Sequence, residues 1–174
     1  MGQLNRVAYH EAAHIVATIA AGLEIPDAGI DLNRPSSVDG AFGSAWVNFF
    51  DVTKIEDEPE KLVAAIWNAS ICCAGAVSDA KILEIELRDA LRQQPGDEKH
   101  AQLCSAEILK DQEEQAIAVF MEQFIAKALR TANDVVTRNW SLVKALAEAS
   151  EAKKGCLNKA DIQSIVKEIG LKSQ

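Results

Sequence analysis

Apolar residues recur along most of the chain with the spacing of amphipathic helices. At residues 4–21 this spacing is clear, and Gly22 followed by Pro26 supplies the stop signal of a helix. Near the other end, Asn158 and Asp161 have the spacing of a helix cap before a last helix at 159–169. The pattern predicts further helices at 59–79, at 80–94, from Asp97 as N-cap toward Lys110, and within 112–150 as one or two helices.

Residues 27–58 have a different pattern, in which glycine, proline and serine interrupt short β-prone pieces. These pieces are 29–32 and 41–50, and no other part of the chain is strand-like. The predicted fold class is therefore mostly α (α+β), with one small β-sheet region near residues 28–50. A chain of 174 residues is expected to form a single domain, 1–174, with a sizeable core.

Charge and composition argue against two kinds of partner. Lys and Arg number 18 against 26 Asp and Glu, and the formal net charge of -8 makes binding to nucleic acid or anionic lipid unexpected. No uninterrupted apolar run reaches the ~18–20 residues of a transmembrane helix, so no membrane partner is expected. The four cysteines lack the spacing of a metal site or a disulfide scaffold, which indicates a cytoplasmic protein with Cys72 and Cys73 as buried, reduced residues.

The first predicted helix contains the sequence His10-Glu11-Ala12-Ala13-His14, which is H-E-x-x-H. Residues four apart lie on one face of a helix, so His10 and His14 can bind one Zn²⁺. Glu11, between them, is within reach of a water that the ion polarises and can act as general base. A catalytic zinc site needs one more protein ligand, and His100 is the remaining histidine of the chain.

The residues around this motif resemble a known family. Residues 7–14, Val-Ala-Tyr-His-Glu-Ala-Ala-His, resemble the V-A-Y-H-E-A-G-H signature of the peptidase domain in FtsH-type AAA+ zinc metalloproteases. Weaker resemblances follow in order: residues 41–46 to the A-L-G-Y-T strand, 74–79 to G-G-R-A-A-E, 96–101 to G-A-S-N-D-L, and 139–149 with 155–166 to the closing helices. The resemblance implies a helical, zincin-like FtsH peptidase-domain fold.

The resemblance also implies roles for individual residues. The Asp of G-A-S-N-D-L is the family's third zinc ligand, and His100 stands at that position, which implies a zinc set of His10, His14 and His100. Three neutral imidazoles leave the full +2 charge of the ion, which favours a more acidic water. Asp97 and Asp79 are expected to hold the ligands by hydrogen bonds. The strand that a substrate peptide pairs with corresponds to Gly43, Ser44, Ala45 and Trp46.

The expected function is that of a zinc-dependent metallopeptidase, an endopeptidase acting on unfolded or flexible protein segments with Glu11 as general base. The 174 residues contain no G-x-x-x-x-G-K-[ST] phosphate loop, so an ATPase partner would act in trans, and an oligomer is compatible with the family. One alternative is an inactive relative that serves as a binding or regulatory module. Another is a structural metal closed by a fourth ligand such as Asp79, Asp97 or a nearby Glu.

Overall fold

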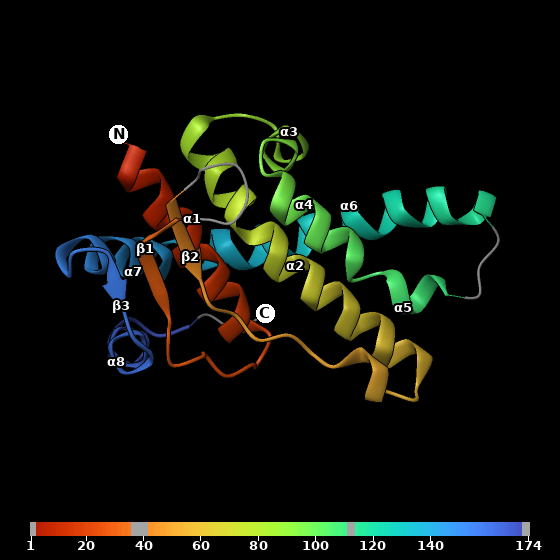
Figure 1. The fold of residues 1–174 in the computed structure, drawn as a ribbon, viewed down its shortest axis with the longest axis horizontal. Coiled ribbons are helices and arrows are strands. Elements are labelled where there is room, and N and C mark those ends of the chain that lie inside the picture. Colours follow the sequence, from red (N-terminus) through yellow and green to blue (C-terminus); the bar gives the residue numbers. More distant parts are fainter. Residues whose placement is uncertain (1–2, 36–41, 111–113, 172–174) are drawn as a thin grey trace.

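The structure is a computed structural model that describes residues 3–35, 42–110 and 114–171, and most of them are helical (Figure 1). The helices are α1 (Gln3–Ala20), α2 (Glu58–Leu83), α3 (Leu87–Arg92), α4 (Pro95–Leu103), α5 (Ala106–Leu109), α6 (Glu114–Arg138), α7 (Trp140–Ala152) and α8 (Lys159–Ile169), with a 3-10 turn, η1, at Val52–Lys54. The strands β1 (Ile30–Pro35), β2 (Phe42–Ala45) and β3 (Cys156–Leu157) form an antiparallel sheet in the order β2-β1-β3. The predicted fold class, mostly α with a small sheet, is confirmed.

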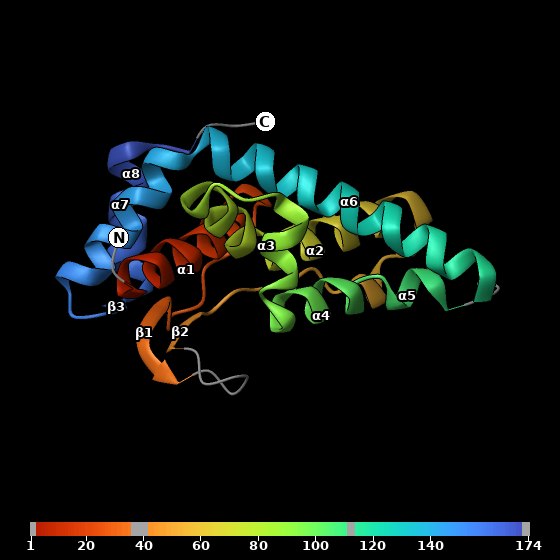
Figure 2. The ribbon, with the colours of Figure 1, turned by 90° about the horizontal axis from the view of Figure 1, so that it is seen from above.

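Helices α1 and α2 form the centre of the molecule, and both bury many small residues. Ala8, Ala12 and Ala13 of α1 are fully buried, as are Ala65 and Ala69 of α2. Small side chains at a helix contact allow the two backbones to lie close together. Figure 2 shows α2 running between α6 and the pair α4 and α5, while α1 also packs against α7 and the sheet.

The ends of α2 depart from the predicted segment 59–79. Asp57 caps its start by accepting a hydrogen bond from the Glu60 backbone N–H at 2.8 Å, with Pro59 in the first turn. The helix continues to Leu83, where Glu84 adopts a left-handed conformation with φ 55° and ends it. The predicted helix 80–94 is therefore wrong as one element, because its first residues belong to α2 and only α3 follows.

Other predictions of local structure have mixed outcomes. The capping arrangement of Asn158 and Asp161 at the start of α8 is confirmed, with a hydrogen bond of 3.0 Å from the Asp161 N–H. The prediction of Asp97 as an N-cap is wrong, since Gln94 is the N-cap of α4 and Pro95 occupies its first turn. Sequence analysis missed β3, and in the described part of the second predicted strand β2 ends at Ala45.

The burial of α2, the most apolar helix, indicates a core helix and not a membrane span. By length and composition α2 could cross a membrane, but 78% of its most apolar window is buried inside the protein. A core helix has this property. Cys72 and Cys73 of α2 are both buried and free, as predicted.

Candidate metal centre

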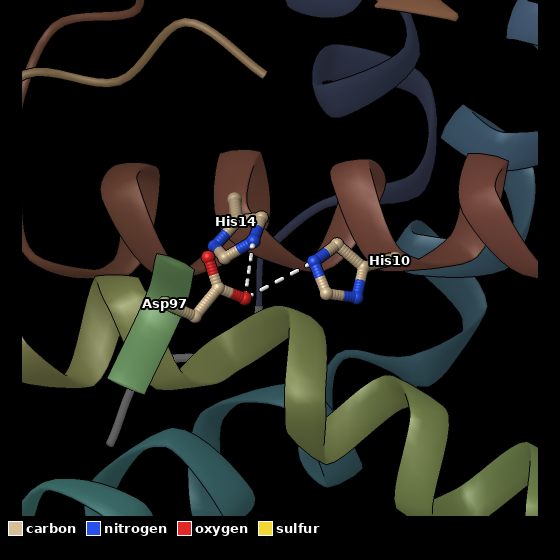
Figure 3. A group of neighbouring side chains, drawn as sticks. All are labelled: His10, His14 and Asp97. Atoms are coloured by element: carbon tan, nitrogen blue, oxygen red, sulfur yellow. Dashed lines mark ion pairs between the residues drawn. The ribbon is translucent and has the colours of Figure 1, made fainter. Parts of the chain in front are cut away.

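His10 and His14 lie one turn apart on α1 and face α2. Their ring centroids are 4.9 Å apart, and the exposed fractions of the two side chains are 13% and 10%. Figure 3 shows both imidazoles on one side of α1, directed toward the side chain of Asp97 on α4. The spacing expected from the H-E-x-x-H motif is thus realised.

Each imidazole is held through its Nδ1 atom by an acceptor. Nδ1 of His14 lies 2.7 Å from the backbone carbonyl oxygen of Ile71, and Nδ1 of His10 lies 3.1 Å from Oδ2 of Asp79. A carbonyl or carboxylate oxygen only accepts, so Nδ1 carries the proton in both rings. In the neutral form of either ring, Nε2 then has a free lone pair.

Asp79, which fixes His10, is itself held firmly. Its carboxylate accepts hydrogen bonds from Arg6 Nε at 3.1 Å and from Gln94 Nε2 at 2.7 Å, and its side chain is only 2% exposed. Burial alone disfavours the charged carboxylate, but the hydrogen bond to His10 and the charges of His10 and Arg6 lower the pKa of Asp79. Asp79 therefore stays ionised and fixes both the tautomer and the orientation of His10.

Asp97 completes the group from α4. Its Oδ2 lies 3.1 Å from His10 Nε2 and 3.5 Å from His14 Nε2, yet this buried oxygen accepts no hydrogen bond among the described residues. With both protons on Nδ1, two nitrogen lone pairs and one carboxylate oxygen converge. Such an arrangement of acceptors requires additional protons or a cation.

The geometry of this group fits a metal ion. Ligand atoms held about 2.0–2.1 Å from a common ion in tetrahedral geometry lie about 3.3 Å apart, and the two measured separations are close to that value. All three ligand atoms lie within 4.8 Å of one another. His10, His14 and Asp97 could therefore hold a metal ion, and two imidazoles with one carboxylate are a donor set that zinc accepts.

Gly75 of α2 leaves space in front of the two rings. A Cβ atom at this position would clash with Nε2 of His10 and with Nε2 of His14. Any side chain at residue 75 would thus occupy the space where the lone pairs converge. The close contact of α1 and α2 and the absence of a side chain at Gly75 together shape the site.

In the absence of a metal, protons compensate the charge of Asp97. Burial opposes the charged imidazole, but the hydrogen bond to Asp79 and the close contact with the Asp97 carboxylate outweigh it and raise the pKa of His10 well above its usual value. The pKa of His14 is raised as well, again against burial, by the charge of Asp97. Burial also opposes ionisation of Asp97, yet the two histidines lower its pKa.

Glu11 lies beside the two histidines and is 9% exposed. Its negative charge contributes to the raised pKa of both His10 and His14, so it is near both rings. On its other side is β2, where a Cβ atom on Gly43 would lie 3.1 Å from Glu11 Oε1. Glu11 thus stands between the histidine pair and the edge of the sheet.

The structure does not bring His100 into the group. Its side chain is exposed on α4, one turn after Asp97, and Asp97 faces the histidines instead. The expected grouping of His100 with His10 and His14 is therefore wrong for this structure, in which Asp97 of α4 is the residue that joins the two histidines. The three imidazoles of the expected set are not brought together.

The expected substrate strand lies at an edge of the sheet. Ser44 pairs with Asp31 of β1, and the Trp46 N–H donates to the Gly29 carbonyl oxygen at 2.8 Å. Because backbone groups alternate in direction along a regular strand, those of Ala45 point away from β1, whereas the register of the two strands shifts beyond Ser44. No strand among the described residues pairs with that edge. The ring of Trp46 lies under the Arg34 guanidinium, 4.5 Å from its centroid.

Several residues of the site were missed by sequence analysis. Arg6 precedes His10 by one helical turn, which is a readable signal, whereas Gln94 is an unremarkable cap residue. The role of Gly75 depends on the distance between two helices, and the Ile71 carbonyl is a backbone group. These last two contributions leave no mark in a single sequence.

Comparison with known proteins adds no assignment: no family model and no curated protein sequence matches the chain.

Proposed function

We propose that the protein is a zinc-dependent endopeptidase that hydrolyses unfolded or flexible segments of polypeptides. The observation that carries the proposal is the convergence of the His10 and His14 Nε2 atoms with Asp97 Oδ2, beside the carboxylate of Glu11. A catalytic zinc site has three protein ligands of this kind and an open position. The Asp97 side chain is 22% exposed, although its Oδ2 atom, which faces the histidines, is buried.

The resemblance to the FtsH-type peptidase domain supports the same assignment after one adjustment. In that family the third ligand is an Asp, and a shift of three residues, from 100 to 97, brings Asp97 to its position. A site with two histidines and one carboxylate would leave a net charge of about +1 on a bound Zn²⁺. The proposed donor set, two histidines and one aspartate, then matches the ligand types of that family, although the aligned position itself is His100.

The chemistry would be divided among the residues as follows. When bound, zinc polarises the scissile carbonyl and lowers the pKa of a coordinated water. Glu11 accepts a proton from the attacking water and delivers it to the leaving amine. Asp79 keeps the proton of His10 on Nδ1, and the Ile71 carbonyl does the same for His14, so that both Nε2 atoms stay directed at the ion.

The edge of β2 supplies a means of holding the substrate. The backbone groups of Ala45 can pair with an extended peptide, which would become a further strand beside β2, where Gly43 lies against Glu11. Pairing of this kind requires a segment free of its own secondary structure. Unfolded polypeptide is therefore the proposed substrate, with folded proteins depending on an unfolding ATPase in trans.

The metal part of the proposal is tested by zinc content and affinity. We expect about one zinc per chain by plasma mass spectrometry. Asp97→Asn should weaken zinc binding by more than about 100-fold, because loss of a ligand exceeds the loss of a supporting hydrogen bond. His100→Ala, on the same helix, is the control and should bind zinc like the wild type. The reverse ranking of these two variants would contradict the assignment.

The catalytic part is tested with Glu11→Gln and an unfolded, fluorophore-labelled protein as substrate. The variant should keep its zinc and lose at least about 100-fold in cleavage rate, because the proton acceptor is gone. Glu122→Gln, an exposed position on α6, is the control. Full activity in Glu11→Gln would exclude this mechanism. A wild type that binds zinc and unfolded protein without cleaving it would be the binding module considered above.

A further inference from the structure

An apolar pocket lies at the start of α2, away from the histidines. Its volume is about 440 Å³. Six apolar residues and one acidic residue, Glu60, line the pocket. The apolar residues are Phe50, Ile55, Pro59, Val63, Ala64 and Trp67. Val63 is 57% exposed, so one wall of the pocket is open to solvent. A pocket of this size and lining suits a large apolar side chain.

The chain segment after β2 connects this pocket to the candidate metal centre. Gly43 lies against Glu11, and seven residues later Phe50 is fixed to α2 by Asn68, which accepts from the Phe50 N–H at 2.8 Å and donates to its carbonyl oxygen at 2.9 Å. Figure 1 shows this segment running from the end of β2 toward the start of α2. A peptide paired with the free edge of β2 would reach the pocket if it continued alongside residues 46–50.

The spacing along α2 gives the distance between pocket and site. Trp67 and Val63 precede Gly75 by eight and twelve residues on one helix, which is about 12 and 18 Å at 1.5 Å per residue. An extended peptide advances about 3.3 Å per residue. The pocket therefore lies about four to six peptide residues from the point where the lone pairs converge.

The rim of the pocket is acidic. Glu60 lines the pocket, and the exposed residues Glu56, Asp57 and Glu58 lie in sequence between the lining residues Ile55 and Pro59. Lys61 forms an ion pair with Glu58 at 2.9 Å. A cationic side chain next to an apolar one would meet favourable charge at the rim.

We propose that this pocket binds a bulky apolar side chain of an extended polypeptide segment, next to a Lys or Arg, about four to six residues from the cleaved bond. The inference rests on the proposed function, since the peptide reaches the pocket along the edge of β2. It assigns the chain a preference for unfolded segments in which apolar and basic residues are neighbours.

The test measures peptide binding separately from peptide cleavage. The probe is a fluorophore-labelled peptide with one Phe-Arg pair in an Ala, Gly and Ser background, with an Ala-Arg peptide for comparison. Binding is measured by fluorescence anisotropy in the zinc-loaded Glu11→Gln protein. Val63→Asp is introduced at the pocket, and Val119→Asp is the matched control, because both valines are the sixth residue of a helix and are 57% and 60% exposed.

The Phe-Arg peptide should bind at least about tenfold more tightly than the Ala-Arg peptide, and Val63→Asp should remove this difference while Val119→Asp keeps it. Equal binding of both peptides, or no effect of Val63→Asp, overturns the inference. A change of molecular mass in Val63→Asp by light scattering also overturns it, because the occupant is then a second copy of the chain.

Cleavage by the wild-type protein separates this inference from the proposed function. If unfolded protein is cleaved but the Phe-Arg preference is absent, the inference fails and the peptidase assignment stands. If the preference depends on Val63 and neither peptide is cleaved, the pocket assignment stands and the peptidase assignment fails.

Discussion

At the residue scale, the candidate site depends on one position that has no side chain. Gly75 is the point where α2 passes directly in front of the two imidazoles, and a Cβ atom would clash with Nε2 of His10. The site therefore requires glycine for space, not for an unusual backbone conformation, since residue 75 lies within a regular helix.

Gly75→Ala should abolish zinc binding while leaving the protein folded, because alanine favours a helix and only the space in front of the rings is lost. Gly96→Ala is the control, since a Cβ atom there meets nothing within 4 Å even though residue 96 adjoins Asp97. Isothermal titration with zinc measures both variants. Wild-type affinity in Gly75→Ala would mean that the ion sits elsewhere.

The shifted pKa values of the histidines predict how the stability of the metal-free protein depends on pH. The folded-state pKa of His10 and of His14 is raised, so their contribution to stability is fully present below about pH 6.5 and is lost as the pH rises through the folded-state values. Asp97 has a lowered pKa, so its contribution is present above about pH 4 and is lost on acidification.

Zinc requires both rings without their Nε2 protons, so the extra stability that zinc confers should increase as the pH rises from about 5.5 to 8. Urea unfolding with and without a chelator across this range measures the difference. A zinc effect that is independent of pH would show that these imidazoles do not release protons on binding.

At the scale of elements, the separation of α2 from α3 depends on Glu84. This residue has φ 55°, a left-handed conformation that costs a residue with a Cβ atom about 1–2 kcal/mol. Glu84→Gly should raise the free energy of unfolding by about 0.5–1 kcal/mol, after allowance for the greater freedom of glycine in the unfolded chain. Glu86→Gly, where φ is -64°, should show no such gain in urea unfolding.

The elements also show what a sequence can and cannot predict about this protein. Helix α1 was predictable because its apolar period and its H-E-x-x-H spacing are local properties, and the cap of α8 is local as well. The two-residue strand β3 has too short a pattern to be recognised, and it exists only because β1 offers an edge. The prediction named His100 instead of Asp97 for a similar reason. Which residue of α4 faces α1 depends on how the two helices pack, and a local pattern does not contain that information.

At the scale of the whole molecule, the candidate site joins distant parts of the chain. His14 and Asp97 are 83 residues apart (97 minus 14), and Asp79 and Gly75 come from a third helix. Local propensity therefore forms the helices, but only the packing of α1 and α4 against α2 brings the acceptors together. Substitutions deep in the core should affect zinc affinity even where they touch no ligand.

The short helix α4 has a consequence for motion. Within α4, which the structure describes throughout, Ala101 is the one fully buried residue, so few apolar contacts fasten this helix to the rest. An ion bound by Asp97 and by the histidines of α1 would hold α4 against α1, and removal of the ion would release this contact. We expect the backbone amides of α4 to exchange with deuterium faster after chelation, while those of buried α2 residues keep their rate. Loss of the ion would then expose α4 to cleavage by other proteases before the rest of the chain.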